Sequence, residues 1–173
     1  MNPKVNTIAL INVIEGRVEA DFNKLEKILL DNCHNKGSHD PTNTRYEDSI
    51  CPSSPIVDHI IDQIVDDFYK TTGKRIVVEN YWGHIHEKNM STRQHDHVGC
   101  FVSSVVYIAV PKGSGSIIFR PHIDSSNKDA FLTAFPPERG RYYLFPSYLE
   151  HYVTRNNSDQ TRVSLSLNFK ERK

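Results

Sequence analysis

The stretch LFPSYLEHYVTRNNSDQTRVSLSLNF, residues 144–169, decides the fold of this chain. From residue 162 onward it alternates polar and apolar side chains, which is typical of a β-strand with one buried face and one polar face. The turn-forming residues at 156–159 separate this strand from an earlier one at 151–155. The pattern therefore predicts a hairpin that places His151 and Arg162 on neighbouring antiparallel strands.

The part of the chain after residue 74 contains further short runs rich in Val, Ile, Tyr, Phe and Ser, separated by turns with Pro, Gly and Asn. Many short strands with regular turns indicate a sandwich or a barrel. Strands are expected at residues 75–82, 100–110, 116–119, 140–145, 151–155 and 161–169.

The part before residue 75 is predicted to be mostly helical. A run of β-branched residues predicts a strand at residues 7–14, and apolar residues at helical spacing predict a helix at about 20–33. A second helix is expected to begin at Ser54 and Pro55 and to end at Thr72 and Gly73. The polar residues 34–53 between the two helices predict a long loop.

These elements predict a mainly β protein with an α+β composition, a double-stranded jelly roll with its N-terminal helices packed outside. The length of 173 residues favours a single domain spanning 1–173. Within it, residues up to about 74 would form the helical support, and residues 75–170 would form the jelly-roll core.

Charge and hydropathy exclude several classes of protein. Lys and Arg number 21 and so do Asp and Glu, so nucleic acid is not expected as the main partner. No apolar run approaches the roughly 20 residues that span a bilayer, and the first residues lack the pattern of a signal peptide. Three cysteines without CxxC spacing favour a reducing, cytoplasmic location. The oligomeric state is not encoded in any of these features.

Histidine is unusually frequent, with nine residues, and two His-x-His pairs stand beside predicted strands. Residues two apart in an extended chain point to the same side, so His95 and His97 would project together toward one metal ion while Asp96 points away. The alternative is a polar loop that happens to be rich in histidine. The second pair, His84 and His86, is predicted to be structural or to line the rim of a cavity.

Arg162 lies on the polar face of the last strand, with Ser164 two residues further on. A buried guanidinium needs an anion, and no acidic residue alternates with Arg162 on that face. The carboxylate of a bound ligand, assisted by the Ser164 hydroxyl, would satisfy it. The alternative is an exposed arginine that pairs with a surface carboxylate.

The order and spacing of these residues resemble the Fe(II)/2-oxoglutarate-dependent oxygenases, and among them a small phage and bacterial subgroup related to the prolyl hydroxylases. The resemblance covers residues 80–169 and rests on HDH at 95–97, SSVVYI at 103–108, VPKGSG at 110–115, LFPS at 144–147, His151 and RVS at 162–164. It implies a double-stranded β-helix that binds Fe(II) through three side chains on one face. It also implies 2-oxoglutarate as cosubstrate, together with O2.

By position, the resemblance makes His95 the first metal ligand and His151 the distal one. Most of the superfamily has Asp or Glu where this chain has His97, although the subgroup also has His-x-His. His97 is favoured as the third ligand, and the alternative is a β-bulge that turns Asp96 inward.

The same resemblance assigns the cosubstrate contacts. Arg162 would bind the far carboxylate of 2-oxoglutarate, Ser164 would assist it, and Tyr107 would offer its phenol to the same carboxylate.

The predicted function is a non-haem Fe(II)- and 2-oxoglutarate-dependent dioxygenase. It would hydroxylate a C–H bond of a protein side chain, of the prolyl type, or of a small metabolite, and release succinate and CO2. Residues 34–53, 83–93 and 121–137 are expected to cover the mouth of the site. Side chains expected to line the cavity are Asn80, Trp82, His84 and His86.

Two other classes of function compete with this prediction. One is a cupin-type enzyme that uses three histidines and a metal but no 2-oxoglutarate, and the other is a non-catalytic jelly-roll binding module. Arg162 discriminates against the first, because it would have no carboxylate to bind. Three grouped histidines discriminate against the second.

Overall fold

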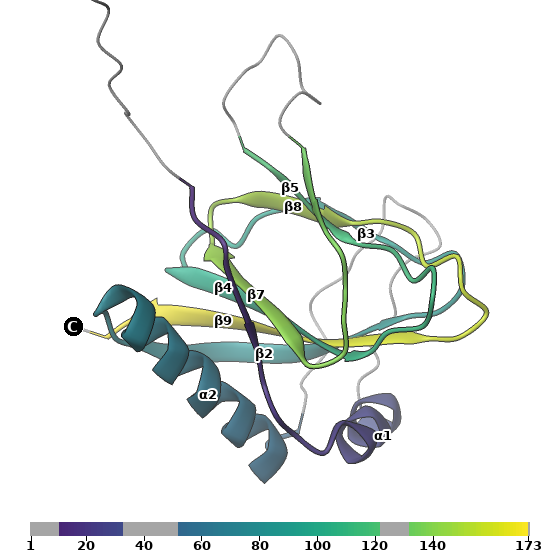
Figure 1. Cartoon of the computed structure of the whole chain (residues 1–173), viewed down its shortest axis with the longest axis horizontal. Helices are drawn as coiled ribbons and strands as arrows, with labels where there is room; N and C mark the ends of the chain where they lie inside the picture. Colours follow the sequence, from purple (N-terminus) through teal and green to yellow (C-terminus); the bar gives the residue numbers. More distant parts are fainter. Residues whose placement is uncertain (1–10, 33–51, 122–131, 173) are drawn as a thin grey trace, which may run out of the picture.

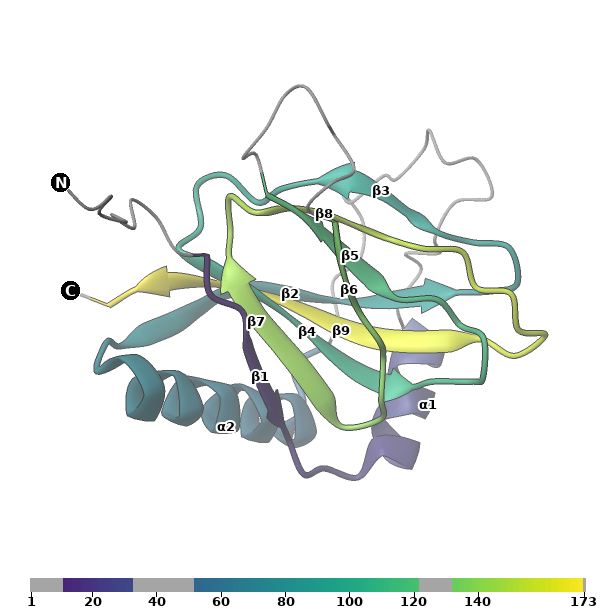
Figure 2. The same cartoon turned by 45° about the horizontal axis from the view of Figure 1, so that its top comes forward.

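The computed structural model describes residues 11–32, 52–121 and 132–172 of the chain (Figure 1). In this part, two antiparallel sheets face each other, and two helices lie outside the larger sheet (Figures 1 and 2). The larger sheet has the strand order β1-β7-β4-β9-β2 and the smaller one β3-β8-β5-β6. The predicted jelly roll with helices packed outside is therefore confirmed.

The elements in chain order are β1 (Ile14–Arg17), α1 (Phe22–Asn32), α2 (Pro55–Thr72), β2 (Ile76–His86), β3 (Thr92–His95), β4 (Val102–Ala109), β5 (Ile117–Arg120), β6 (Thr133–Phe135), β7 (Arg141–Pro146), β8 (Glu150–Val153) and β9 (Arg162–Glu171).

The alternation along β9 determines which side chains enter the site. Its apolar residues Val163, Leu165, Leu167 and Phe169 are fully buried and pack in one cluster with the helices. The intervening residues Arg162, Ser164, Ser166 and Asn168 therefore lie on the other face, which meets the smaller sheet. Strand β9 therefore contributes apolar side chains to the core beneath the helices and polar side chains to the space between the two sheets.

Helix α2 covers the outer face of the larger sheet with the apolar stripe expected from the sequence. Its buried residues are Val57, Ile60, Ile61, Ile64 and Phe68. The Ser54 hydroxyl accepts a hydrogen bond from the Val57 N–H at the first turn, and Gly73 ends the helix with a φ of 73°. The apolar stripe of α2 therefore packs against the outer face of the larger sheet.

A second apolar cluster fills the space between the two sheets. It contains Val105, Tyr107, Ile117, Phe119, Tyr143, Phe145 and Leu149. The rings of Phe119 and Phe145 meet edge to face at 4.8 Å between centroids. This aromatic core borders the histidines described below and fixes the distance between the sheets.

Several sequence predictions need correction. The part of residues 7–14 that the structure describes becomes a strand only at Ile14, and residues 1–10 lie outside the described residues. The short strands β3 and β6 fall in segments for which no strand was predicted. The residues of β3 are all polar and β6 has only three residues, so neither carries a clear strand signal.

The predicted hairpin between His151 and Arg162 is wrong. β8 pairs with β3 and β5, whereas β9 pairs with β4 and β2, so the two residues belong to opposite sheets. The turn residues at 156–159 do reverse the chain, but they also carry it from one sheet to the other. His151 and Arg162 consequently face each other across the interior.

Candidate active site

Three imidazoles converge between the sheets. His95 ends β3 and lies directly opposite His151 of β8 in the strand register, and His97 follows two residues later. One nitrogen from each of the three rings lies within 4.8 Å of the others. This spacing suits the binding of one metal ion by His95, His97 and His151.

Hydrogen bonds orient two of these rings. The Nδ1 of His95 donates to the Arg93 carbonyl at 2.7 Å, and the Nδ1 of His151 donates to the Leu149 carbonyl at 2.9 Å. Because a carbonyl only accepts, each ring carries its proton on Nδ1 and its lone pair on Nε2. Backbone bonds of this kind fix the tautomer of metal-binding histidines.

Burial keeps the three imidazoles neutral. Desolvation lowers the pKa of His95 and holds the pKa of His151 well below its ordinary value. It also lowers the pKa of His97 to about 4, with the neighbouring His95 acting in the same direction. Neutral imidazole is the form that binds metals, so the group is ready to bind one at neutral pH.

Asp96 stands apart from the three histidines. Its side-chain oxygen accepts a hydrogen bond from the Val98 N–H at 3.4 Å, and it is not among the grouped ligand atoms. The His97 N–H donates to the Ser147 carbonyl at 2.8 Å, which ties the segment after β3 to the turn before β8. The structure therefore brings His97, and not Asp96, to the other two rings.

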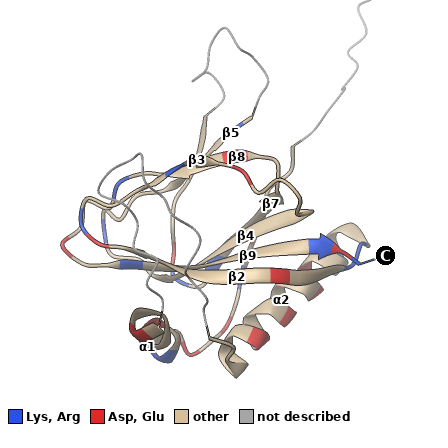
Figure 3. Cartoon of the chain, turned by 180° about the vertical axis from the view of Figure 1, so that it is seen from behind, with Lys and Arg blue, Asp and Glu red and all other residues tan. Residues whose placement is uncertain are grey.

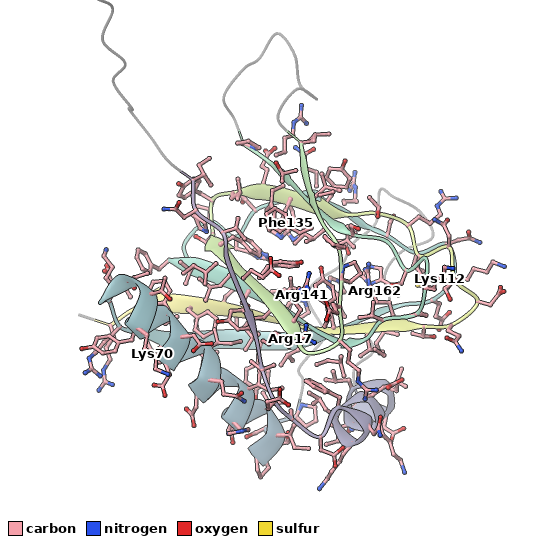
Figure 4. The ribbon with its side chains drawn as sticks, in the orientation of Figure 1. Arg17, Lys70, Lys112, Phe135, Arg141 and Arg162 are labelled. Carbon is pink, nitrogen blue, oxygen red and sulfur yellow. The ribbon has the colours of Figure 1, made fainter. Side chains whose placement is uncertain are left out.

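Arg162 is buried in the same cavity, with 1% of its surface exposed (Figure 4). Burial lowers its pKa to about 10, so it remains a cation at neutral pH. Among the described residues no carboxylate forms an ion pair with it, and the acidic residues of α2 lie outside the larger sheet (Figure 3). The alternative of an exposed, surface-paired arginine is therefore wrong.

The contacts of Arg162 leave binding capacity in the cavity. One terminal nitrogen, Nη1, donates to the Ser114 carbonyl at 2.8 Å, while Nε has no hydrogen-bond partner within the described part of the chain. The buried Tyr107 hydroxyl also lacks such a partner there. Unsatisfied buried donors beside an unpaired cation are the chemistry of an anion site.

The strand register places Tyr107 and Ser164 next to each other. Ser164 of β9 lies opposite Tyr107 of β4 on one side and opposite His84 of β2 on the other. The next pair on the same face of β2 and β9 is His86 with Arg162. The resemblance-based cosubstrate residues thus form one patch on the inner face of the larger sheet.

Both residues of the second His-x-His pair are buried on this face, because β2 extends to residue 86. The Nε2 of His86 lies 2.8 Å from the Thr92 hydroxyl, and Trp82 lies 5.7 Å from His97 between ring centroids. Trp82, His84 and His86 all line the cavity, as predicted. Asn80, further along β2, is exposed and does not line it.

Of the segments expected to cover the mouth, residues 34–51 and 122–131 lie outside the described residues.

The cavity between the three imidazoles and Arg162 is narrow, with a volume of about 30 Å³. Entry of a ligand larger than water therefore requires the lining side chains to move apart. The lining has three grouped imidazoles at one end and the Arg162 guanidinium at the other, with polar side chains between them.

One contact in the site has no signal in the sequence. Ser114 acts through its backbone carbonyl, which every residue possesses, so its identity reveals nothing. The only hint is its position between Gly113 and Gly115, both with a φ of 84°, because glycine readily adopts this left-handed conformation. These glycines shape the turn that aims the Ser114 carbonyl at Arg162.

Fold and site together define a jelly-roll protein with a three-histidine group suited to one metal ion. Residues 80–168, just over half of the chain, match the family model described as "Putative 2OG-Fe(II) oxygenase". The chain therefore belongs to the family of 2-oxoglutarate and Fe(II)-dependent oxygenases. A comparison with curated protein sequences gave no match.

Solved structures show the same fold. The viral collagen prolyl hydroxylase of Paramecium bursaria Chlorella virus-1, in its 2-oxoglutarate complex, has a TM-score of 0.62 and 12% identity, covering 92% of this chain and 94% of that one. A Pseudomonas putida prolyl-4-hydroxylase has a TM-score of 0.60 and 16% identity, covering 91% and 92%. An oxidoreductase of the 2OG-Fe(II) oxygenase family from Burkholderia pseudomallei has a TM-score of 0.56 and 14% identity, covering 69% of this chain and 60% of that one.

The family implies Fe(II), 2-oxoglutarate and O2, and the residues present fit them. Three neutral imidazoles can bind Fe(II), although the group lacks the carboxylate of the common two-His-one-carboxylate triad. Arg162, which has no carboxylate partner among the described residues, fits the far carboxylate of a dicarboxylic cosubstrate. None of the helices that the structure describes is long and apolar enough to cross a membrane.

Proposed function

We propose that the protein is a dioxygenase that uses Fe(II) and 2-oxoglutarate to hydroxylate a C–H bond and releases succinate and CO2. One observation carries the proposal: a buried arginine without a carboxylate partner among the described residues lines the same cavity as three grouped imidazoles. A cupin-type enzyme that does not bind 2-oxoglutarate would leave this charge uncompensated, at a high energetic cost.

Each residue has a defined task in this proposal. His95, His97 and His151 would hold Fe(II), with the Nδ1 bonds of His95 and His151 keeping their rings oriented. Arg162 would bind the far carboxylate of 2-oxoglutarate, and Ser164 and Tyr107 would donate to it. When bound, the iron would activate O2 and couple the oxidative decarboxylation of 2-oxoglutarate to hydroxylation of the substrate.

The aromatic side chains around the site would exclude water from it. Phe145 packs against His151 at 4.7 Å between ring centroids, and Phe119 lies behind it. A dry surrounding strengthens the attraction between Arg162 and a carboxylate. It also limits unproductive reactions near the metal-binding side chains.

As substrate class we propose a prolyl side chain in a polypeptide. The prolyl hydroxylases of known structure named above match this chain over almost its whole length. An open, mostly apolar groove of about 540 Å³ adjoins the histidines, since Val98, Gly99 and Ser147 line it and Phe145 borders both spaces. Such a groove offers room for residues flanking a target proline, which a free metabolite would not fill.

An anaerobic titration with Fe(II) and then 2-oxoglutarate tests the activity. The proposal expects a visible charge-transfer band that needs both components and is lost in Arg162→Ala. Iron binding without the band would favour a three-histidine cupin-type enzyme. Absence of any metal binding would leave a non-catalytic binding module.

The substrate class is tested separately by mass spectrometry. Proline-containing peptides incubated aerobically with the loaded enzyme should gain one oxygen atom and yield succinate in equal amount. Free proline is the control for a small-metabolite substrate. Oxidation of free proline in preference to the peptides would contradict the polypeptide assignment.

A further inference from the structure

His84 occupies a central place in the cavity that the assignments above leave unused. It lies on the inner face of β2, with only 6% of its surface exposed. Ser164 stands directly opposite it in the strand register, and Tyr107 stands on the far side of Ser164. His84, Ser164 and Tyr107 thus form one row across β2, β9 and β4.

This row lies between the two ends of the cavity. Arg162 belongs to the neighbouring row on one side, opposite His86, and Trp82, which packs near His97, belongs to the row on the other side. His84 lines the same cavity as His95, His97 and Arg162. A ligand that joins the metal ligands to Arg162 must pass this row.

The neighbours of His84 make it suitable as a neutral donor. Burial and the positive charge of Arg162 lower the pKa of His84 to about 3, so the ring is uncharged at neutral pH. A neutral imidazole carries one N–H, which can donate to a carboxylate. The adjacent His86 is held by Thr92, with ring centroids of the two histidines 4.9 Å apart.

A carboxylate at Arg162 would need this additional donor. An ionised carboxylate has about four acceptor positions. Arg162 already uses Nη1 for the Ser114 carbonyl, and Tyr107 and Ser164 approach from one side of the row. The side facing β2 is occupied by His84.

We propose that His84 is a cosubstrate-binding residue, which donates a hydrogen bond to the carboxylate held by Arg162 from the side opposite Tyr107. This inference rests on the proposed function, because it requires 2-oxoglutarate in the cavity. It adds a residue on β2 to a site otherwise formed by β4 and β9. It also gives the buried His84 a role apart from metal binding.

The test measures binding to the Mn(II)-loaded protein by calorimetry, without turnover. His84→Leu removes the donor at similar volume, and His84→Gln retains an N–H donor. We expect the Kd of 2-oxoglutarate to rise at least tenfold in His84→Leu and less than threefold in His84→Gln. The Kd of Mn(II) should stay within twofold of the wild type in both variants.

Pyruvate serves as the ligand control, because it keeps the 2-oxo acid group but lacks the far carboxylate. Its Kd should be the same in wild type and His84→Leu if His84 acts on that carboxylate. An equal loss for pyruvate and 2-oxoglutarate would place His84 at the metal end and overturn the proposal. Should His84→Leu fail to unfold cooperatively, His84→Met provides a second donor-free side chain for the same measurements.

The outcomes separate this inference from the proposed function. If the wild type binds 2-oxoglutarate and His84→Leu binds it equally well, only the role of His84 is overturned. If both variants lose Mn(II) binding, His84 supports the metal group and the proposal is wrong. If the wild type itself binds no 2-oxoglutarate, the proposed function and this inference are overturned together.

Discussion

At the scale of single residues, the choice between His97 and Asp96 defines the chemistry of the metal group. The His97 imidazole lies with His95 and His151, whereas the Asp96 side chain bonds the backbone of Val98. If these three histidines hold Fe(II) as proposed, a set of three neutral ligands would leave the full double charge of the ion on the site. This charge would strengthen the attraction for the anionic cosubstrate compared with a triad that contains a carboxylate.

Two single variants test the third ligand. His97→Ala should lower Fe(II) affinity at least a hundredfold, because it removes one of three protein ligands, and Asp96→Ala should change it less than threefold. Anaerobic equilibrium dialysis measures both values, with thermal unfolding as the control for folding. The reverse order of the two effects would show that Asp96 turns inward when metal binds.

The sequence predicted the side chains that line the site but not the backbone group that contacts Arg162. Spacing nominated His95 and His97 as metal ligands, strand alternation nominated Arg162 as an anion-binding residue, and the resemblance to the oxygenases added His151. The structure gathers all four in one cavity. The Ser114 carbonyl could not be nominated, because a backbone acceptor has no identity of its own. His84 was nominated only as a cavity residue, since its role depends on the register between β2 and β9, which local pattern does not determine.

At the scale of elements, the turn between β4 and β5 links backbone geometry to the anion site. Gly115 has a φ of 84°, and a Cβ there would lie 2.5 Å from the Thr154 carbonyl oxygen. Gly113 has the same φ, but a Cβ there would meet nothing within 4 Å. Alanine at position 113 would therefore introduce backbone strain alone, whereas alanine at position 115 would introduce the same strain and a steric clash.

Alanine substitutions in this turn should have unequal effects. Gly113→Ala should cost about 1 kcal/mol of unfolding free energy, from the left-handed backbone alone. Gly115→Ala should cost roughly 3 kcal/mol, because the backbone must also shift away from Thr154. It should additionally weaken 2-oxoglutarate binding, since the Ser114 carbonyl would no longer orient Arg162. Urea unfolding and calorimetry measure these effects, and equal costs at both glycines would contradict the role of the clash.

The strands themselves were predictable where burial leaves a periodic pattern. The alternation along β9 and the stripe of α2 gave bounds within two residues of those observed. The pairing of β8 was not predictable, because a turn signal does not distinguish a hairpin from a connection that crosses between two sheets. That choice depends on which strands pair with each other in the complete jelly roll.

At the scale of the whole molecule, the interior of the barrel is built around neutral histidines. His84, His86, His95, His97 and His151 all have lowered pKa values, with desolvation as the largest cause. In the unfolded chain these imidazoles would titrate near pH 6.5. Below that pH the unfolded state binds more protons than the folded state, so stability must decrease as the pH falls.

The free energy of unfolding of the metal-free protein should consequently begin to fall at pH values well above those at which carboxylates titrate. For His84, whose pKa is lowered to about 3, the loss of unfolding free energy between pH 7 and pH 5 is about 2 kcal/mol. The other four imidazoles act in the same direction. Urea unfolding in the presence of a chelator measures the total, and His84→Gln should reduce it by the share of His84. An unchanged pH dependence in that variant would mean that the His84 ring accepts a proton in the folded protein, contrary to its burial beside Arg162.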